Sequence, residues 1–114
     1  MNPLPKRLTP QTLAQLAGGK SSIKLFEHGS LAIEIYRPFG VDRQTPHTRD
    51  EIYVVMSGSG EFVCAGERRP FAPGEVLFVP AGMEHRFDEF TVDFAAWVFF
   101  YGPDGGEAMG KVAP

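Results

Sequence analysis

The chain has 114 residues, the usual size of one domain, which leaves no room for a second hydrophobic core. Its apolar fraction of 43% and aromatic fraction of 12% exclude a disordered chain. The formal net charge of −3 argues against nucleic acid as a partner, because phosphate binding requires a basic patch.

The sequence indicates neither membrane insertion nor secretion. The longest apolar run, from Phe94 to Tyr101, is far shorter than the ~20 residues of a membrane-spanning helix. The N-terminal charges are not followed by the apolar segment of a signal peptide. The single cysteine, Cys64, excludes an intramolecular disulfide and fits a reducing compartment. We therefore expect a cytoplasmic protein without a membrane partner.

Residues 1–21 are predicted to form an arm with a short helix. Thr9 is a suitable N-cap and Pro10 a suitable first helical residue. Leu13 and Leu16 supply an apolar stripe, and Gly18 ends it. A helix of at most about two turns is marginal by itself, so it must pack against the rest of the domain.

Residues 22–101 are predicted to form an all-β domain. Apolar and polar residues alternate with period two in residues 22–27 and 31–36, which is typical of strands. Further strands are predicted at residues 51–56, 61–65, 69–71, 75–79, 85–88 and 91–101. Glycine, proline and serine mark the turns, and about eight short strands in succession indicate a sandwich or barrel. The glycine-rich tail, residues 102–114, is expected to be flexible.

Three side chains form a candidate metal site. His47 and Glu51 flank a turn, so a histidine at the end of one segment can face a carboxylate at the start of the next strand. His85 follows a second turn, Pro80-Ala81-Gly82, and proline rigidifies the backbone before both histidines. Two imidazoles and one carboxylate suit Fe(II), Mn, Ni, Zn or Cu. The remaining histidine, His28, lies in a predicted turn and is not expected to be a ligand.

These residues fall into two motifs that resemble those of the cupin superfamily. The second cupin motif, G-x5-P-x-G-x2-H-x3-N, is matched by Gly74, Pro80, Gly82 and His85, with Glu89 in place of its asparagine. The first motif, G-x5-H-x-H-x3-4-E-x6-G, is matched in its second half by His47, Glu51 and Gly58. Its first half differs, because Thr45 replaces the first histidine and Gly40 is one residue out of register.

The resemblance covers about residues 22–101 and implies a single-domain jelly-roll barrel. Cupins usually hold their metal with three histidines and one glutamate, so this chain lacks one ligand. Thr45 is two residues from His47, which places both on one face of an extended strand. We expect water at the vacant position. Gln44 and Asp42 are the candidates for an extra ligand if Pro46 marks a bulge.

By strand parity, Tyr53 and Val55 share the face of Glu51, so we expect them to line the pocket together with Thr45. The resemblance favours a small-molecule enzyme of dioxygenase, isomerase or lyase type that uses a divalent metal. No catalytic residue can be singled out; Glu89, Arg49 and Tyr53 are conceivable acid–base groups. The alternatives are a non-catalytic cupin that binds or senses a small ligand, and a structural cupin without metal.

A homodimer is expected. The last predicted strand carries apolar side chains on both faces, with Val98 and Phe100 on one and Trp97 and Phe99 on the other. A strand of this kind lies between two layers or at a subunit interface.

Overall fold

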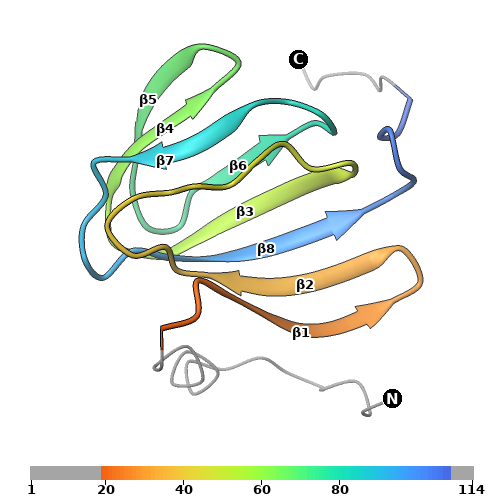
Figure 1. Ribbon diagram of the computed structural model, residues 1–114, viewed down its shortest axis with the longest axis horizontal. Coiled ribbons are helices and arrows are strands. Elements are labelled where there is room, and N and C mark those ends of the chain that lie inside the picture. Colours follow the sequence, from red (N-terminus) through yellow and green to blue (C-terminus); the bar gives the residue numbers. More distant parts are fainter. Residues whose placement is uncertain (1–18, 109–114) are drawn as a thin grey trace.

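The computed structural model describes residues 19–108 (Figure 1). This part of the chain contains eight strands and no helix. The strands are β1 (Ser22–His28), β2 (Leu31–Tyr36), β3 (Asp50–Ser57), β4 (Gly60–Cys64), β5 (Glu67–Phe71), β6 (Val76–Val79), β7 (His85–Asp88) and β8 (Ala95–Tyr101). The helix expected between Thr9 and Gly18 lies outside the described residues. Among these residues, no helix is long and apolar enough to cross a membrane.

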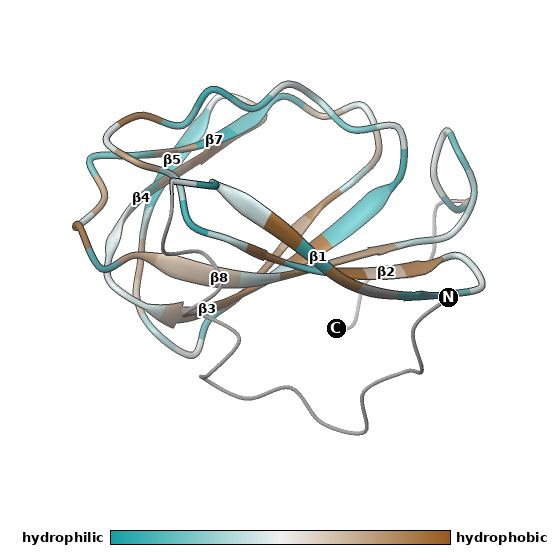
Figure 2. Cartoon of the chain, turned by 60° about the horizontal axis from the view of Figure 1, so that its bottom comes forward, coloured by the Kyte–Doolittle hydropathy of each residue, from teal (hydrophilic) through white to brown (hydrophobic). Residues whose placement is uncertain are grey.

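The strands form two antiparallel sheets that enclose one core. The larger sheet has the order β1-β2-β8-β3-β6, and the smaller has the order β5-β4-β7. Figure 1 shows the smaller sheet lying across one side of the larger one. Figure 2 shows β2 and β8 in the hydrophobic colours and β5 in largely hydrophilic ones. This two-layer arrangement is the jelly-roll architecture.

Strand parity decides which side chains enter the core. In β3, Tyr53 and Val55 are buried, and their partners on β8, Val98 and Ala96, are buried too. The smaller sheet contributes Phe62 and Phe87, and the connection before β8 contributes Phe94. The complete core cluster is Tyr53, Val55, Phe62, Phe71, Val79, Phe87, Phe94, Ala96 and Val98.

Glu51 shares the inward face of β3 with this aromatic core. Phe87 packs edge-on against Tyr53 with ring centroids 4.9 Å apart, and stacks obliquely with Phe94 at 4.6 Å. Such aromatic pairs add to the free energy gained from burial and fix the rings relative to one another. The core therefore holds β3 and β7 in place, and these two strands carry Glu51 and His85.

The segment after β8 is tied to the end of β3. Glu107 N donates to Asp50 Oδ2 at 2.8 Å, and Gly105 N donates to the carbonyl of Thr48 at 2.6 Å. The other oxygen of the buried Asp50 accepts from Ala81 N at 2.8 Å. The flexible tail predicted for residues 102–114 stays a prediction, although Gly105 and Glu107 make these contacts with the start of β3 and the loop before it. They also brace the residue that precedes Glu51.

Candidate metal centre

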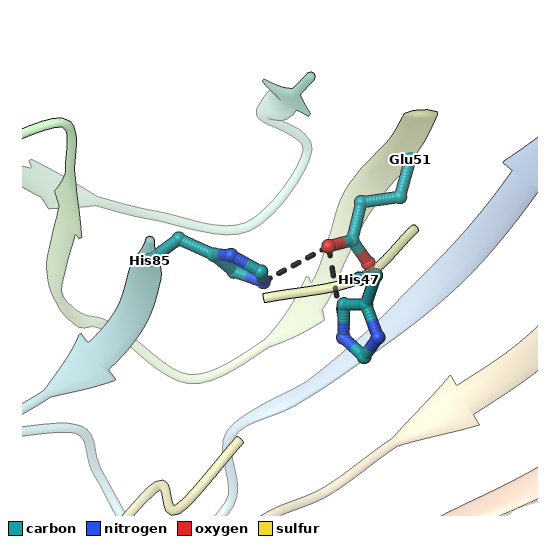
Figure 3. Close-up of side chains that lie close together, drawn as sticks. All are labelled: His47, Glu51 and His85. Carbon is teal, nitrogen blue, oxygen red and sulfur yellow. Dashed lines mark ion pairs between the residues drawn. The ribbon is translucent and has the colours of Figure 1, made fainter. Parts of the chain in front are cut away.

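The three side chains predicted as ligands come from three different segments and meet at one end of the sandwich. Glu51 is the second residue of β3, His85 is the first residue of β7, and His47 lies in the connection between β2 and β3. Glu51 Oε1 lies 2.9 Å from His85 Nε2 and 3.8 Å from His47 Nε2. Figure 3 shows the dashed lines from the two histidines meeting at this oxygen. One ligand atom from each residue lies within 4.8 Å of the other two.

The Glu51 carboxylate is fully buried, with 0% of the residue exposed. Neither of its oxygens accepts a hydrogen bond from a described residue as long as His85 Nε2, 2.9 Å from Oε1, carries no proton. An ionised carboxylate in such surroundings is costly unless a cation neutralises it. The orphaned oxygens, with two imidazole nitrogens beside them, therefore fit a bound divalent cation.

His85 presents a lone pair to Glu51. Its Nδ1 lies 2.9 Å from the carbonyl oxygen of Met83, which can only accept, so Nδ1 carries the proton in the neutral ring. Nε2 is then free to bind a metal. Burial lowers the pKa of His85, but the Glu51 carboxylate and the Met83 carbonyl raise it by more, and the net pKa lies above its usual value. Without a metal, this buried anion favours a proton on Nε2.

A second pair of polar side chains, Asp42 and Gln44, lies beside these ligands. Gln44 Oε1 is 3.1 Å from His85 Nε2 and 3.3 Å from His47 Nε2, and it accepts a hydrogen bond of 2.9 Å from the Tyr53 hydroxyl. Gln44 Nε2 donates to Asp42 Oδ2 at 2.6 Å. Asp42 itself is buried.

Comparison with known families agrees with this arrangement. The family model described as the cupin domain matches residues 32–99, which is more than half of the chain. The chain belongs to the cupin family. The two motifs and the jelly-roll fold predicted from the sequence are thereby confirmed.

The chain is also similar to individual proteins from several organisms. An uncharacterized protein of Streptomyces coelicolor is 38% identical over 63 residues, which span 55% of this chain and 60% of that protein. The crystal structure of the DMSP lyase DddQ from Ruegeria pomeroyi superposes with a TM-score of 0.60 at 28% identity. That match covers 71% of this cupin but only 46% of the lyase chain. A Cupin 2 conserved barrel domain protein from Salinispora arenicola matches with a TM-score of 0.61 and 23% identity, covering 89% and 91% of the two chains.

A cavity of about 410 Å³ is lined by His47, one of the three candidate ligands. This volume lies within the range of small-molecule sites. His47, Gln44 and Tyr53 form the wall next to the cluster, and Glu34 on β2 and Arg43 in the following loop also line it. The remaining lining residues are Ser21, Ser22, Tyr36, Phe39, Val41, Val98 and Phe100. The cavity therefore combines an apolar body with a few charged or polar groups.

Glu34 is a cavity residue that the sequence analysis missed. Period-two alternation divides residues 31–36 into two faces but does not say which one faces the interior. The register with β8 pairs Glu34 with Val98, which lines the same cavity. Burial raises the pKa of Glu34 above its usual value. The only sequence signal was a carboxylate in the middle of an otherwise apolar strand.

Of the other predicted site residues, one lines the cavity and the rest lie elsewhere. Tyr53 lines the cavity, whereas Val55 belongs to the hydrophobic core. Thr45 is exposed and is not among the cavity residues. Arg49 donates to the carbonyl of Ser30, and Glu89 is exposed, so neither side chain lies in the cavity wall.

Burial raises the pKa of Tyr53 well above its usual value, and the negative charges of Glu51 and Asp42 raise it further. The Tyr53 hydroxyl therefore stays protonated at neutral pH. It can donate one hydrogen bond, and its contacts within reach are Gln44 Oε1 and His85 Nε2, the latter at 3.1 Å. The site thus offers a protonated phenol next to its metal-binding atoms.

Proposed function

We propose that this cupin binds a divalent metal ion through His47, Glu51 and His85, and that it acts as an enzyme on a small, oxygen-bearing molecule in the adjoining cavity. The buried Glu51 carboxylate is the observation that carries the proposal. With His85 Nε2 unprotonated, this carboxylate accepts no hydrogen bond from a described residue, and the Nε2 atoms of His85 and His47 lie 2.9 and 3.8 Å from its Oε1. A divalent ion held there would polarise a carboxylate, carbonyl or enolate oxygen of the bound molecule.

Among the reaction types that cupins support, we favour lyase or isomerase chemistry over dioxygenation. Elimination by a lyase and isomerisation by proton transfer both begin with removal of a proton from carbon next to a carbonyl or carboxylate group. The cavity supplies two groups suited to proton transfer. Glu34 is a carboxylate whose pKa burial raises above its usual value, which suits a general base. Tyr53 remains protonated and can donate to a developing oxyanion.

The likeness to the DMSP lyase, at 28% identity, supports the lyase class. This cupin spans less than half of that chain, so we extend only the reaction class to it and not the substrate. Glu34 and Arg43 at the cavity wall favour a polar molecule that carries a hydrogen-bond donor as well as an acidic group. Phe39, Val98 and Phe100 would cover its apolar part.

Metal analysis tests the first half of the proposal. Protein purified without a histidine tag or chelator should contain about one transition-metal ion per chain. Glu51→Gln and His85→Ala should each remove most of it, because even residues that merely support a ligand typically contribute 10–100-fold to affinity. His28→Ala is the matched control, since this exposed histidine ends β1 and does not belong to the cluster of candidate ligands. A metal-free wild type that binds no added ion, or equal metal content in all variants, would favour the structural cupin instead.

Deuterium exchange tests the second half. The metal-loaded protein is incubated in D2O with a panel of 2-oxo acids, 3-hydroxy acids and 3-substituted carboxylates, and proton spectra are followed. Lyase or isomerase chemistry predicts loss of the signal from carbon-bound hydrogen next to the carboxyl or carbonyl group. Oxygen uptake without exchange would indicate a dioxygenase. Saturable binding without either reaction would indicate a cupin that only binds or senses its ligand.

A further inference from the structure

We propose that the side-chain amide of Gln44 supplies the fourth protein ligand of the metal centre, and that Asp42 holds this amide with its oxygen facing the metal. The proposal rests on the metal site proposed above and names a donor that the cupin motif does not contain. It converts the usual centre of three imidazoles and one carboxylate into one with two nitrogen and two oxygen donors.

The first argument for Gln44 as a ligand comes from the distances between the donor atoms. Donors that share one ion through bonds of about 2.0 to 2.2 Å lie roughly 2.8 to 3.6 Å from one another. Gln44 Oε1 lies 3.1 Å from His85 Nε2 and 3.3 Å from His47 Nε2. Glu51 Oε1 lies 2.9 Å from the same atom of His85, and 3.8 Å from His47 Nε2, slightly beyond this range. Gln44 Oε1 is therefore spaced from the imidazoles as a ligand of the same ion would be.

The orientation of the amide follows from Asp42. A carboxylate only accepts hydrogen bonds, so the Gln44 atom 2.6 Å from Asp42 Oδ2 must be the NH2 group. The carbonyl oxygen is then directed at His47 and His85. Tyr53 agrees with this assignment, because its hydroxyl lies 2.9 Å from Oε1 and can donate to it.

Asp42 is itself fixed by its surroundings. Its Oδ2 accepts from Phe87 N on β7 at 2.8 Å, and its Oδ1 accepts from Gln44 N at 3.1 Å and from the Tyr36 hydroxyl. Hydrogen bonds from three residues thus satisfy a buried carboxylate that would otherwise be costly. This network links β2 and β7 to the amide, so Gln44 is preorganised rather than free to rotate.

The same geometry explains the missing histidine. Thr45, at the motif position of the first histidine, is exposed, whereas Gln44 is turned towards the cluster. The loop between β2 and β3 is therefore displaced by one residue from the motif. An amide oxygen is a harder donor than imidazole, and oxygen donors suit Mn(II) better relative to Ni(II), Cu(II) or Zn(II). We expect Gln44 to lower the preference of this cupin for those later metals.

Isothermal titration of the apo protein with Mn(II) and with Ni(II) tests the proposal in four proteins: wild type, Gln44→His, Gln44→Asn and Thr45→His. Gln44→His should raise the ratio of Ni(II) to Mn(II) affinity by about tenfold or more, because imidazole replaces oxygen. Gln44→Asn keeps the amide but shortens its reach, and should weaken Mn(II) binding by about 10–100-fold. Thr45→His is the matched control. It adds an imidazole one residue away, at the motif position, and should leave both affinities unchanged.

X-ray absorption of the Ni(II) forms gives a second readout that is independent of activity. Two imidazoles are expected in wild type and Thr45→His, and three in Gln44→His. Asp42→Asn tests the positioning role: the new amide can face Gln44 with either end, so Mn(II) affinity should fall while the imidazole count stays at two.

Wild-type affinities in Gln44→Asn, or a third imidazole in Thr45→His but not in Gln44→His, would overturn the proposal. Failure of wild type itself to bind either ion would instead remove the metal site on which it rests. Circular dichroism of each variant establishes that the β fold is retained, and Gln44→Asn, as the smallest change, decides the outcome if Asp42→Asn does not fold.

Discussion

At the scale of single residues, protons and a metal ion compete for the same lone pairs on the imidazole nitrogens of His47 and His85. His47 and His85 bind a metal only as neutral imidazoles, and the usual histidine pKa is about 6.5. Although burial lowers the pKa of His85, the Glu51 carboxylate and the Met83 carbonyl raise it by more, so protonation begins above the usual value. Loss of bound metal should therefore begin above about pH 6.5 and increase as the pH falls further.

Dialysis at pH 7.5 and at pH 5, followed by metal analysis, measures this loss. Protein returned from pH 5 to pH 7.5 should bind added metal again, which separates ligand protonation from unfolding. Complete retention of metal at pH 5 would mean that the ion is not held by these two histidines.

Glu34 gives a prediction on stability. Because burial raises its pKa in the folded protein, the ionised carboxylate destabilises the fold above that pKa, and the penalty vanishes below the pKa of the unfolded chain. Glu34→Gln should therefore stabilise the protein at pH 7, and the gain should shrink as the pH is lowered towards 4. The gain stays below about 1 kcal/mol because solvent screens this partly exposed group.

Thermal unfolding monitored by circular dichroism at several pH values measures the effect. Glu67→Gln on β5 is the control, because Glu67 is exposed and should change stability at neither pH. A Glu34→Gln variant that is less stable than wild type at pH 7 would contradict the prediction. It would show that the carboxylate is satisfied in the folded protein.

At the scale of elements, two glycines in turns allow the cost of a steric clash to be compared with the cost of backbone strain. Gly58 lies between β3 and β4, and Gly66 lies between β4 and β5. Gly58 and Gly66 both have positive φ, +79° and +80°. A Cβ atom at Gly58 would lie 2.5 Å from Cα of Phe94, whereas one at Gly66 would meet nothing within 4 Å. Gly66→Ala should cost about 1–2 kcal/mol from the left-handed conformation alone. Gly58→Ala should cost about 3 kcal/mol or more, because the backbone before β8 must also move.

Urea unfolding of the two variants at equal protein concentration compares these losses. Equal losses would mean that the loop before β8 yields easily to the added methyl group. The contact also accounts for the glycine that ends the first cupin motif, since the turn and the connection carrying Phe94 approach closely only without a side chain there.

At the scale of the whole molecule, one apolar face stays partly uncovered among the described residues. Val76 and Phe78 on β6 are 64% and 52% exposed. They pair with Val54 and Ile52 on β3, and β6 is an edge strand of its sheet. We propose that a second copy of the chain packs on this face. In a dimer with two-fold symmetry the same surface of both subunits meets, so each apolar edge would cover the other. Exposed apolar edges otherwise lead to aggregation.

Light scattering should accordingly give about twice the chain mass of 12.5 kDa. The double variant Val76→Glu/Phe78→Glu should be monomeric. Val92→Glu should remain dimeric, because Val92 is 91% exposed but lies in the connection between β7 and β8, outside this face. A monomeric wild type, or a dimer unaffected by the double variant, would rule out this interface.

The sequence by itself determined the all-β fold and the His47, Glu51 and His85 cluster. Period-two alternation and glycine-bearing turns are local signals, and the two motifs place their residues at fixed spacings along strands that the fold always pairs in the same way. The strand His85–Asp88 could be predicted with its observed bounds for this reason. Likewise, the parity of β3 correctly placed Tyr53 on the same side as Glu51.

Only the tertiary structure decided the surroundings of that cluster. The choice between Thr45 and Gln44 depends on a loop whose path is set by distant contacts, such as Phe87 N with Asp42 and Gly82 N with the carbonyl of His47. Glu34 enters the cavity because β2 pairs with β8, which lies about 65 residues further along the chain. Periodicity is a property of neighbouring residues, whereas these positions follow from pairings between distant strands, which no local pattern encodes.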